Sequence, residues 1–132
     1  QGRAGRVDKK PEQFVIHRHT TASGIHWDLM LEAGGVLWTW RLSVPPDQIG
    51  TTPVYAEQIA DHSHRFLTYE GPVQKNTGQV QRADAGEYLL LDRSVQTLLF
   101  ELNGSILSGR FELIRQDQNQ WILRRPILME GL

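Results

Sequence analysis

Cysteine is absent from the 132 residues of this chain. The absence excludes disulfides, thiolate metal sites and cysteine nucleophiles, so any metal must be held by histidine and carboxylate. No apolar run approaches the roughly 18 residues that a membrane helix needs, and the N-terminus carries no apolar signal core. We therefore expect a cytoplasmic protein that has no membrane partner.

Neither sign of charge dominates, because 14 Lys and Arg face 15 Asp and Glu, for a net charge of −1. The total therefore predicts no general electrostatic attraction to nucleic acid, and only a local basic patch stays open. Size and composition are typical of a single globular domain. Residues 1–13 are basic and polar and predict a flexible lead-in, so we expect the folded domain to span residues 14–132.

Short β-compatible runs separated by turn signals fill the rest of the chain. Ala33-Gly34-Gly35 lies between two such runs and predicts a tight hairpin. The polar stretch 61–71 is expected to be irregular, with at most a short helical turn. Nine strands in an antiparallel barrel or sandwich follow from this pattern. Their expected ranges are 14–19, 26–32, 36–42, 54–60, 79–82, 88–92, 96–102, 109–115 and 120–125.

The histidines are the most informative residues, because all five lie between positions 17 and 64. Residues two apart in a strand share a face, so His17 and His19 point together, as do His26 and Asp28. If the two runs pair, two or three imidazoles and one carboxylate converge. Such a donor set suits Mn²⁺, Fe²⁺ or Zn²⁺. The alternative is that this row is the solvated face of a sandwich.

Two further groups of side chains allow more than one interpretation. His62 and His64 follow Asp61 in a predicted loop, where either could be a ligand, a general acid or a solvated residue. Tryptophans can stack on nucleobases, but their strand alternation favours core packing. The four tryptophans are Trp27, Trp38, Trp40 and Trp121.

Five segments together resemble the 3′-phosphoesterase domain of bacterial DNA ligase D over residues 14–125. They read FVIHRHTTASGIHWDLMLE, GGVLWTW, DHSHRFLTYEG, GRFELIR and WILRR. The resemblance implies a single antiparallel β-barrel whose polar interior holds a divalent metal, commonly manganese. It assigns the metal to His19, His26 and Asp28 and a phosphate contact to His62. It further implies DNA 3′ ends as substrate, and a DNA ligase or polymerase of break repair as partner.

The chain departs from that family at several positions around the implied site. Met30 stands where the family has a phosphate-binding arginine, and Phe66 stands where it has a tyrosine. His17 replaces the usual glutamine and adds a candidate catalytic or substrate contact. Three arginines are candidates to replace the missing phosphate-binding guanidinium, and they are Arg41, Arg65 and Arg110.

Three hypotheses of function follow. The first is a metal-dependent phosphoesterase, a hydrolase that removes a 3′-phosphate or a 3′-terminal ribonucleotide from DNA during repair. The second is a catalytically weakened barrel that docks DNA ends or a protein partner, and the departures at Met30 and Phe66 motivate it. The third is a non-haem iron oxygenase that uses His26, Asp28 and His62 as its facial triad.

Overall fold

The computed structural model describes residues 11–127 of the chain. Residues 1–10 of the predicted lead-in, and residues 128–132 of the predicted domain, lie outside the described residues. Glu12 and Gln13, which we assigned to the lead-in, already belong to the first strand. The strand begins there because both residues pair with the long sixth strand, at Tyr88 and Glu87.

Strands make up nearly all of the described chain, with two short 3-10 helices between them. The strands are β1 (Glu12–Thr21), β2 (Gly24–Ala33), β3 (Val36–Leu42), β4 (Val54–Ser63), β5 (Gly71–Val73), β6 (Gly78–Arg93), β7 (Thr97–Gly104), β8 (Ser108–Asp117) and β9 (Gln120–Arg124). The helices are η1 (Pro46–Gln48) and η2 (His64–Leu67).

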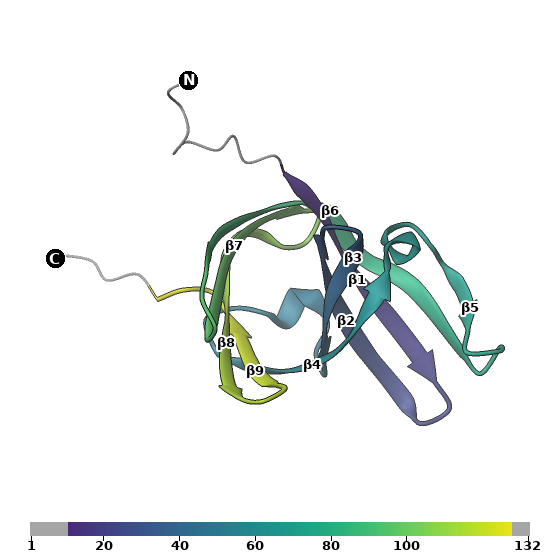
Figure 1. The fold of residues 1–132 in the computed structure, drawn as a ribbon. Coiled ribbons are helices and arrows are strands. Elements are labelled where there is room, and N and C mark those ends of the chain that lie inside the picture. Colours follow the sequence, from purple (N-terminus) through teal and green to yellow (C-terminus); the bar gives the residue numbers. More distant parts are fainter. Residues whose placement is uncertain (1–10, 128–132) are drawn as a thin grey trace, which may run out of the picture.

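Eight antiparallel strands close into a barrel, which confirms the predicted fold class. They follow the order β1-β2-β3-β4-β9-β8-β7-β6, and β6 pairs back with β1 to complete the ring. Every strand of the ring therefore pairs with a neighbour on both sides, although β4 pairs with β9 only from Val54 to Glu57. The β1–β2 hairpin and the first half of β6 extend beyond the barrel, where β5 pairs with β6 (Figure 1).

The interior of the barrel is apolar, which corrects the expected polar interior. On β1 and β2, the inward residues Phe14, Ile16, Leu29 and Leu31 join the main core. That core also contains Trp40, Trp121, Phe100 and Phe111, and the rings of Trp40 and Trp121 meet edge to face at 5.6 Å. The row between the inward residues, which carries the histidines, therefore faces outward.

A second, smaller apolar cluster lies on that outer face. Val15, Met30 and Leu37 project from three neighbouring strands, and Leu67 of η2 packs on them. Phe66 of η2 is partly buried against the same cluster. The cluster holds η2 against the outer face of the sheet and so encloses the adjoining polar row.

Most strand ends shift by one or two residues from the prediction, and three elements differ by more. The runs 79–82 and 88–92 belong to one strand, β6, because Asp84 between them is buried and stays paired with β1. The oxygens of Asp84 accept hydrogen bonds from the backbone N–H groups of Ser105, Ile106 and Leu107. Strand β5 was not predicted, and β4 continues three residues into the stretch expected to be irregular. The helical turn expected in that stretch is η2.

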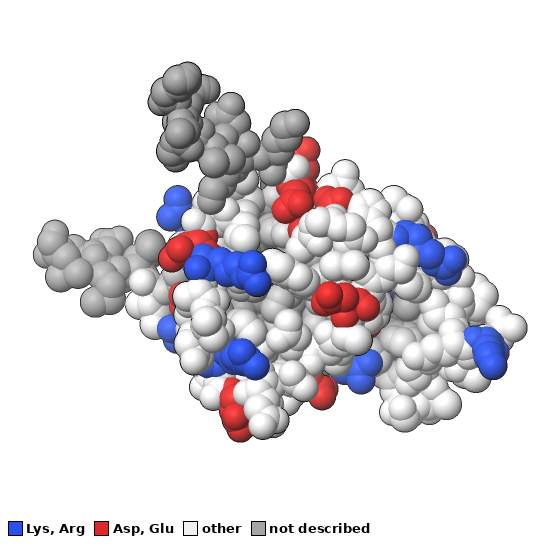
Figure 2. Space-filling view, in the orientation of Figure 1, with Lys and Arg blue, Asp and Glu red and all other residues white. Residues whose placement is uncertain are grey.

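Acidic and basic side chains mix on the surface. Figure 2 shows Lys and Arg interspersed with Asp and Glu on one face, in agreement with the balanced charge of the chain (Figure 2). Among residues 11–127, no helix has the length and apolar character to cross a membrane.

Candidate metal centre

The predicted histidine and carboxylate row is brought together by the β1–β2 hairpin. His17 lies directly opposite Asp28, and His19 lies opposite His26. The two-residue turn between the strands is followed by Gly24 at φ 137°, a conformation that side-chain-bearing residues rarely adopt. The turn therefore fixes the register that puts all four side chains on one face, as the sequence predicted.

Three of these residues converge tightly enough to hold one ion. His19 Nδ1 lies 3.0 Å from His26 Nε2 and 3.7 Å from Asp28 Oδ2, and His26 Nε2 lies 3.4 Å from the same oxygen. Two ligands bonded at about 2.1 Å to one ion, at the angles of four- to six-coordinate geometry, are about 3.0–3.4 Å apart. The three donor atoms therefore fit a divalent metal with little movement.

Buried atoms without partners support the same interpretation. Asp28 is buried, and its Oδ1 has no hydrogen-bond partner among the described residues. His19 Nε2 is likewise buried without one. Gly78 packs against this nitrogen so closely that a Cβ there would lie 3.0 Å away, so only glycine leaves the ring its room. Buried polar groups are nearly always satisfied, so the unsatisfied oxygen of Asp28, whose other oxygen is one of the converging atoms, fits a bound cation. His19 Nε2 is the ring nitrogen that does not converge and does not bear on the ion.

The pKa shifts of the two histidines favour metal binding, whereas the pKa shift of Asp28 opposes it. Burial lowers the pKa of His19, helped by His26, and burial with the nearby Arg41 lowers the pKa of His26. Both rings therefore favour the neutral form that coordinates metal. Burial raises the pKa of Asp28, while Arg41 and His19 oppose the rise. A bound cation would stabilise the ionised carboxylate that burial penalises.

A cavity of about 220 Å³ opens beside the cluster. His17, His19 and Asp28 form its floor, and His62 and Phe66 come from β4 and η2. The cavity is completed by Val73, Gln74 and Val80. The space next to the donor atoms is thus large enough for a small substrate group.

His62 lies in β4 rather than in the predicted loop. Its Nδ1 donates to the carbonyl of Ala60 at 3.0 Å, and its Nε2 has no hydrogen bond to another residue in the range 11–127. A bulge between Leu37 and Thr39 of the β3–β4 ladder shifts the alternation of β4. Because of this shift, His62 turns to the outer face, next to the metal cluster.

His17 is held neutral at physiological pH. Burial, followed by the nearby His62 and Arg82, lowers its pKa to about 4. Its Nε2 is buried without a partner among residues 11–127, and its ring meets Phe66 edge to face at 6.1 Å. A neutral imidazole orients a substrate or ligand by hydrogen bonding and supplies no positive charge to a phosphate.

The three candidate arginines occupy different places. Arg41 lies opposite Asp28, with its Nε 3.8 Å from Asp28 Oδ1. Arg65 stacks over Tyr69 and Phe66, with its Cζ 4.6 Å and 5.1 Å from the ring centres. Arg110 does not belong here, because β8 lies four strands from β2 in either direction around the barrel. This corrects its assignment to the site.

The structure also shows where the residues that depart from the family pattern lie. Met30 is fully buried in the outer apolar cluster, under η2, and does not line the cavity. Phe66 does line it. His64 lies outside the cluster, because its Nε2 pairs with Glu32 Oε2 at 2.5 Å.

Sequence reasoning missed the wall formed by β5 and its turn. Gln74, Lys75 and Asn76 all adopt left-handed conformations, with φ of 55°, 56° and 71°. Gly71 and Gly78 flank this segment in the sequence and were the available signal for a short hairpin.

The iron triad finds no support, because the cluster that the described residues form contains His19 in place of His62.

Comparisons with known proteins agree with this site. A family model described as the DNA Ligase D 3'-phosphoesterase domain matches residues 17–115. The chain belongs to this family. The match includes the cluster, the cavity and most of the barrel strands.

Individual relatives show the same likeness. The chain is 31% identical over 123 residues to the multifunctional non-homologous end joining protein LigD of Pseudomonas aeruginosa, covering 84% of this chain and 14% of that protein. It is 32% identical over 121 residues to the LigD DNA repair protein of Mycobacterium tuberculosis, covering 85% of this chain and 16% of that protein. The chain thus spans about a sixth or less of the curated relatives it matches.

Proposed function

We propose that this domain is a metal-dependent phosphoesterase that removes a 3′-phosphate or a 3′-terminal ribonucleotide from DNA. The convergence of His19, His26 and Asp28 beside a cavity of about 220 Å³ carries the proposal. Membership of the phosphoesterase family supports it, as do the end-joining and repair names of the relatives. Manganese is the first candidate ion, with zinc and iron as alternatives, because the donors are two imidazoles and a carboxylate.

Each residue has a distinct role in this proposal. His19, His26 and Asp28 would hold the ion, which would polarise a phosphoryl oxygen and orient water. His62 directs its Nε2 to the substrate, where the protonated ring would donate a hydrogen bond to a phosphoryl oxygen and the neutral ring would accept one from water. His17 stays neutral and positions the substrate through hydrogen bonding.

Arg41 is the best-placed replacement for the guanidinium that Met30 lacks. It projects from the strand next to Asp28, and its Nε has no hydrogen-bond partner among the described residues. A charge-assisted hydrogen bond to a phosphate is worth about 1.5–3 kcal/mol. Arg41 would supply this contact from β3, while the family places it on the strand that carries Asp28.

A DNA strand ending in 3′-phosphate, annealed to a template, tests the proposal. We expect manganese-dependent release of phosphate by the full chain, and none in EDTA. His26→Ala should abolish release because it removes a ligand. His64→Ala is the matched control, since His64 pairs with Glu32 outside the cluster and should keep activity.

Three results would decide between the first two hypotheses. Release that is lost in H26A and kept in H64A supports the phosphoesterase. Manganese binding with no release from either the 3′-phosphate or the 3′-ribonucleotide strand would overturn it in favour of a docking module. Release that persists in H26A would show that another site, or a contaminant, performs the reaction.

A further inference from the structure

A second cavity lies at one mouth of the barrel, on the other face of β3 and β4 from the metal cluster. It measures about 350 Å³. Its aromatic wall is Trp38, Trp40 and Trp121, and its charged residues are Asp61, Arg93 and Arg115. Gln58, Ser94, Val95 and Leu98 complete it.

The two arginines at this mouth stack on tryptophans. Arg93 Cζ lies 4.6 Å from the ring centre of Trp38, and Arg115 Cζ lies 5.9 Å from that of Trp121. Arg93 is exposed, and its guanidinium has no hydrogen bond or ion pair to any described residue. Stacking holds these planar cations at the rim while leaving N–H groups for a ligand.

An unpartnered donor lies deeper in the same cavity. Trp40 is 1% exposed, and its Nε1 has no hydrogen-bond partner among residues 11–127. Trp121 provides the internal comparison, because its Nε1 donates to Gln58 Oε1 at 3.1 Å. Buried indole N–H groups usually find a partner. The orphaned N–H of Trp40 would gain an acceptor from a ligand that enters the cavity and displaces the side chains that cover this atom.

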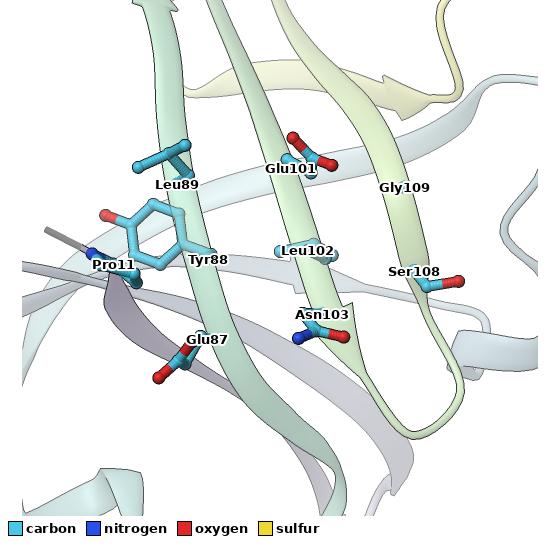
Figure 3. Close-up of a pocket in the computed structure, with 9 residues that line it drawn as sticks. All are labelled: Pro11, Glu87, Tyr88, Leu89, Glu101, Leu102, Asn103, Ser108 and Gly109. Atoms are coloured by element: carbon cyan, nitrogen blue, oxygen red, sulfur yellow. The ribbon is translucent and has the colours of Figure 1, made fainter. Parts of the chain in front are cut away.

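The collected chemistry fits a nucleotide of single-stranded DNA. The guanidinium plane of the exposed Arg93 can stack on a base, and arginines also bind the neighbouring phosphate. The Trp40 N–H matches a base carbonyl or ring nitrogen, and Asp61 matches an exocyclic amino group. A different cavity, of about 330 Å³, presents the carboxylates of Glu87 and Glu101, which repel phosphate (Figure 3).

The two sites are linked through β4. Asp61 lines the mouth cavity, and the next residue, His62, lines the metal cavity. Strand β4 pairs with β9 only from Val54 to Glu57, so its edge beyond Gln58 has no strand partner in the described part of the chain. A DNA strand that crosses this edge can reach both cavities.

We propose that the tryptophan- and arginine-lined mouth of the barrel binds an unpaired DNA nucleotide while the metal cavity holds the 3′ end. Placement of the DNA 3′ end in the metal cavity rests on the proposed function above, whereas nucleotide binding at the mouth does not. It would act as a positioning site for a single-stranded or frayed terminus.

Binding of fluorescein-labelled single-stranded oligonucleotides with a 3′-hydroxyl end tests the nucleotide site without any reaction. Anisotropy in EDTA reports affinity for the full chain and for Arg93→Gln, which changes an exposed residue. We expect R93Q to weaken binding about 10-fold or more. Arg110→Gln is the matched control, because it removes the same charge from an exposed residue of β8 that does not line the mouth cavity, and it should change affinity less than about 2-fold.

Two more measurements identify the group that is bound. Trp40→Phe keeps an aromatic side chain but replaces the indole by a smaller ring without the N–H. It should weaken binding several-fold, and a measured unfolding midpoint confirms that the variant folds. An oligonucleotide series with one abasic position, moved along the strand, should lose affinity at one or two positions in the wild type. The same series should show no such position in R93Q.

The results separate the two proposals. Equal affinity of the wild type, R93Q and W40F, or equal binding of all abasic strands, would overturn the nucleotide site even if phosphate release is observed. Weaker binding by R93Q, with no phosphate release from any strand, would keep the nucleotide site and overturn the phosphoesterase. Equal losses in R93Q and R110Q would show only general charge attraction and would also overturn the nucleotide site.

Discussion

The two faces of the β1–β2 hairpin carry opposite chemistry from the same stretch of sequence. Its inner face contributes Phe14, Ile16 and Leu29 to the barrel core. Its outer face contributes His19, His26 and Asp28 to the candidate metal centre. Asp28 and Leu29 are neighbours in the sequence, and both are buried. Asp28 has an oxygen without a hydrogen-bond partner among the described residues, whereas Leu29 packs among the apolar side chains of the core.

This difference shows how the barrel separates stability from function. Strand alternation lets each second residue build the closed core while its neighbours are free to carry donors. The small outer cluster of Val15, Met30, Leu37 and Leu67 then covers the donors with η2. Substitutions on the inner row should therefore unfold the protein, and substitutions on the outer row should disable it.

Leu29→Ala gives the largest expected effect. Leu29 is 1% exposed within the main core, so its truncation should cost about 2–5 kcal/mol of unfolding free energy. Urea denaturation followed by tryptophan fluorescence measures the loss. A cost below about 1 kcal/mol would show that the inner row is less important to the barrel than its packing indicates.

Asp28→Asn changes the adjacent residue on the other face. It should reduce manganese affinity at least about 100-fold, because second-shell changes alone cost 10- to 100-fold. The metal-free stability should stay the same or rise, since the variant removes a buried carboxylate that lacks a full set of partners. Calorimetric titration and urea denaturation measure the two quantities, and parallel losses in both would contradict the separation.

Asp84→Asn changes a second buried carboxylate, which can be compared with that of Asp28. Asp84 accepts hydrogen bonds from four backbone N–H groups, of Ala85, Ser105, Ile106 and Leu107. An amide cannot replace all of these contacts, so we expect a loss of about 2 kcal/mol in unfolding free energy and no change in metal affinity. An unchanged urea midpoint would show that the Asp84 carboxylate, like that of Asp28, does not contribute to the stability of the fold.

Tyr88 gives the smallest effect and a pH dependence. Burial, together with Glu12 and Glu32, raises the pKa of its phenol, whose hydroxyl donates to the Glu32 carbonyl. The unfolded chain ionises at about pH 10 while the folded chain keeps the proton, so folding loses stability as pH rises above that value. Wild-type unfolding free energy should fall more steeply above pH 10 than that of Tyr88→Phe. Equal slopes would contradict this.

Much of the fold follows from the sequence because strand alternation is a local signal. The Gly34-Gly35 hairpin and the pairing of the two histidine runs agree with the prediction. Alternation identifies two faces without showing which one is interior. Val15 and Met30 make the outer face partly apolar, so alternation alone does not show that the donors lie outside the barrel.

The remaining differences depend on contacts between distant segments. A bulge in the β3–β4 ladder turns His62 toward the metal cavity, and bulges leave no clear trace in a single sequence. Asp84 interrupts the apolar pattern of β6 and is satisfied only by backbone from the β7–β8 turn. Arg110 was a candidate by residue type alone, and strand order places it on the far side.

Anomalous diffraction from manganese-soaked crystals, collected at the manganese edge, tests the metal centre most directly. The account predicts one strong peak about 2.0–2.3 Å from His19 Nδ1, His26 Nε2 and a carboxylate oxygen of Asp28. The same soak of Asp28→Asn should lose that peak. A strong peak at other residues, or none at these three in the wild type, would contradict the central claim that the outer face of this hairpin binds the metal.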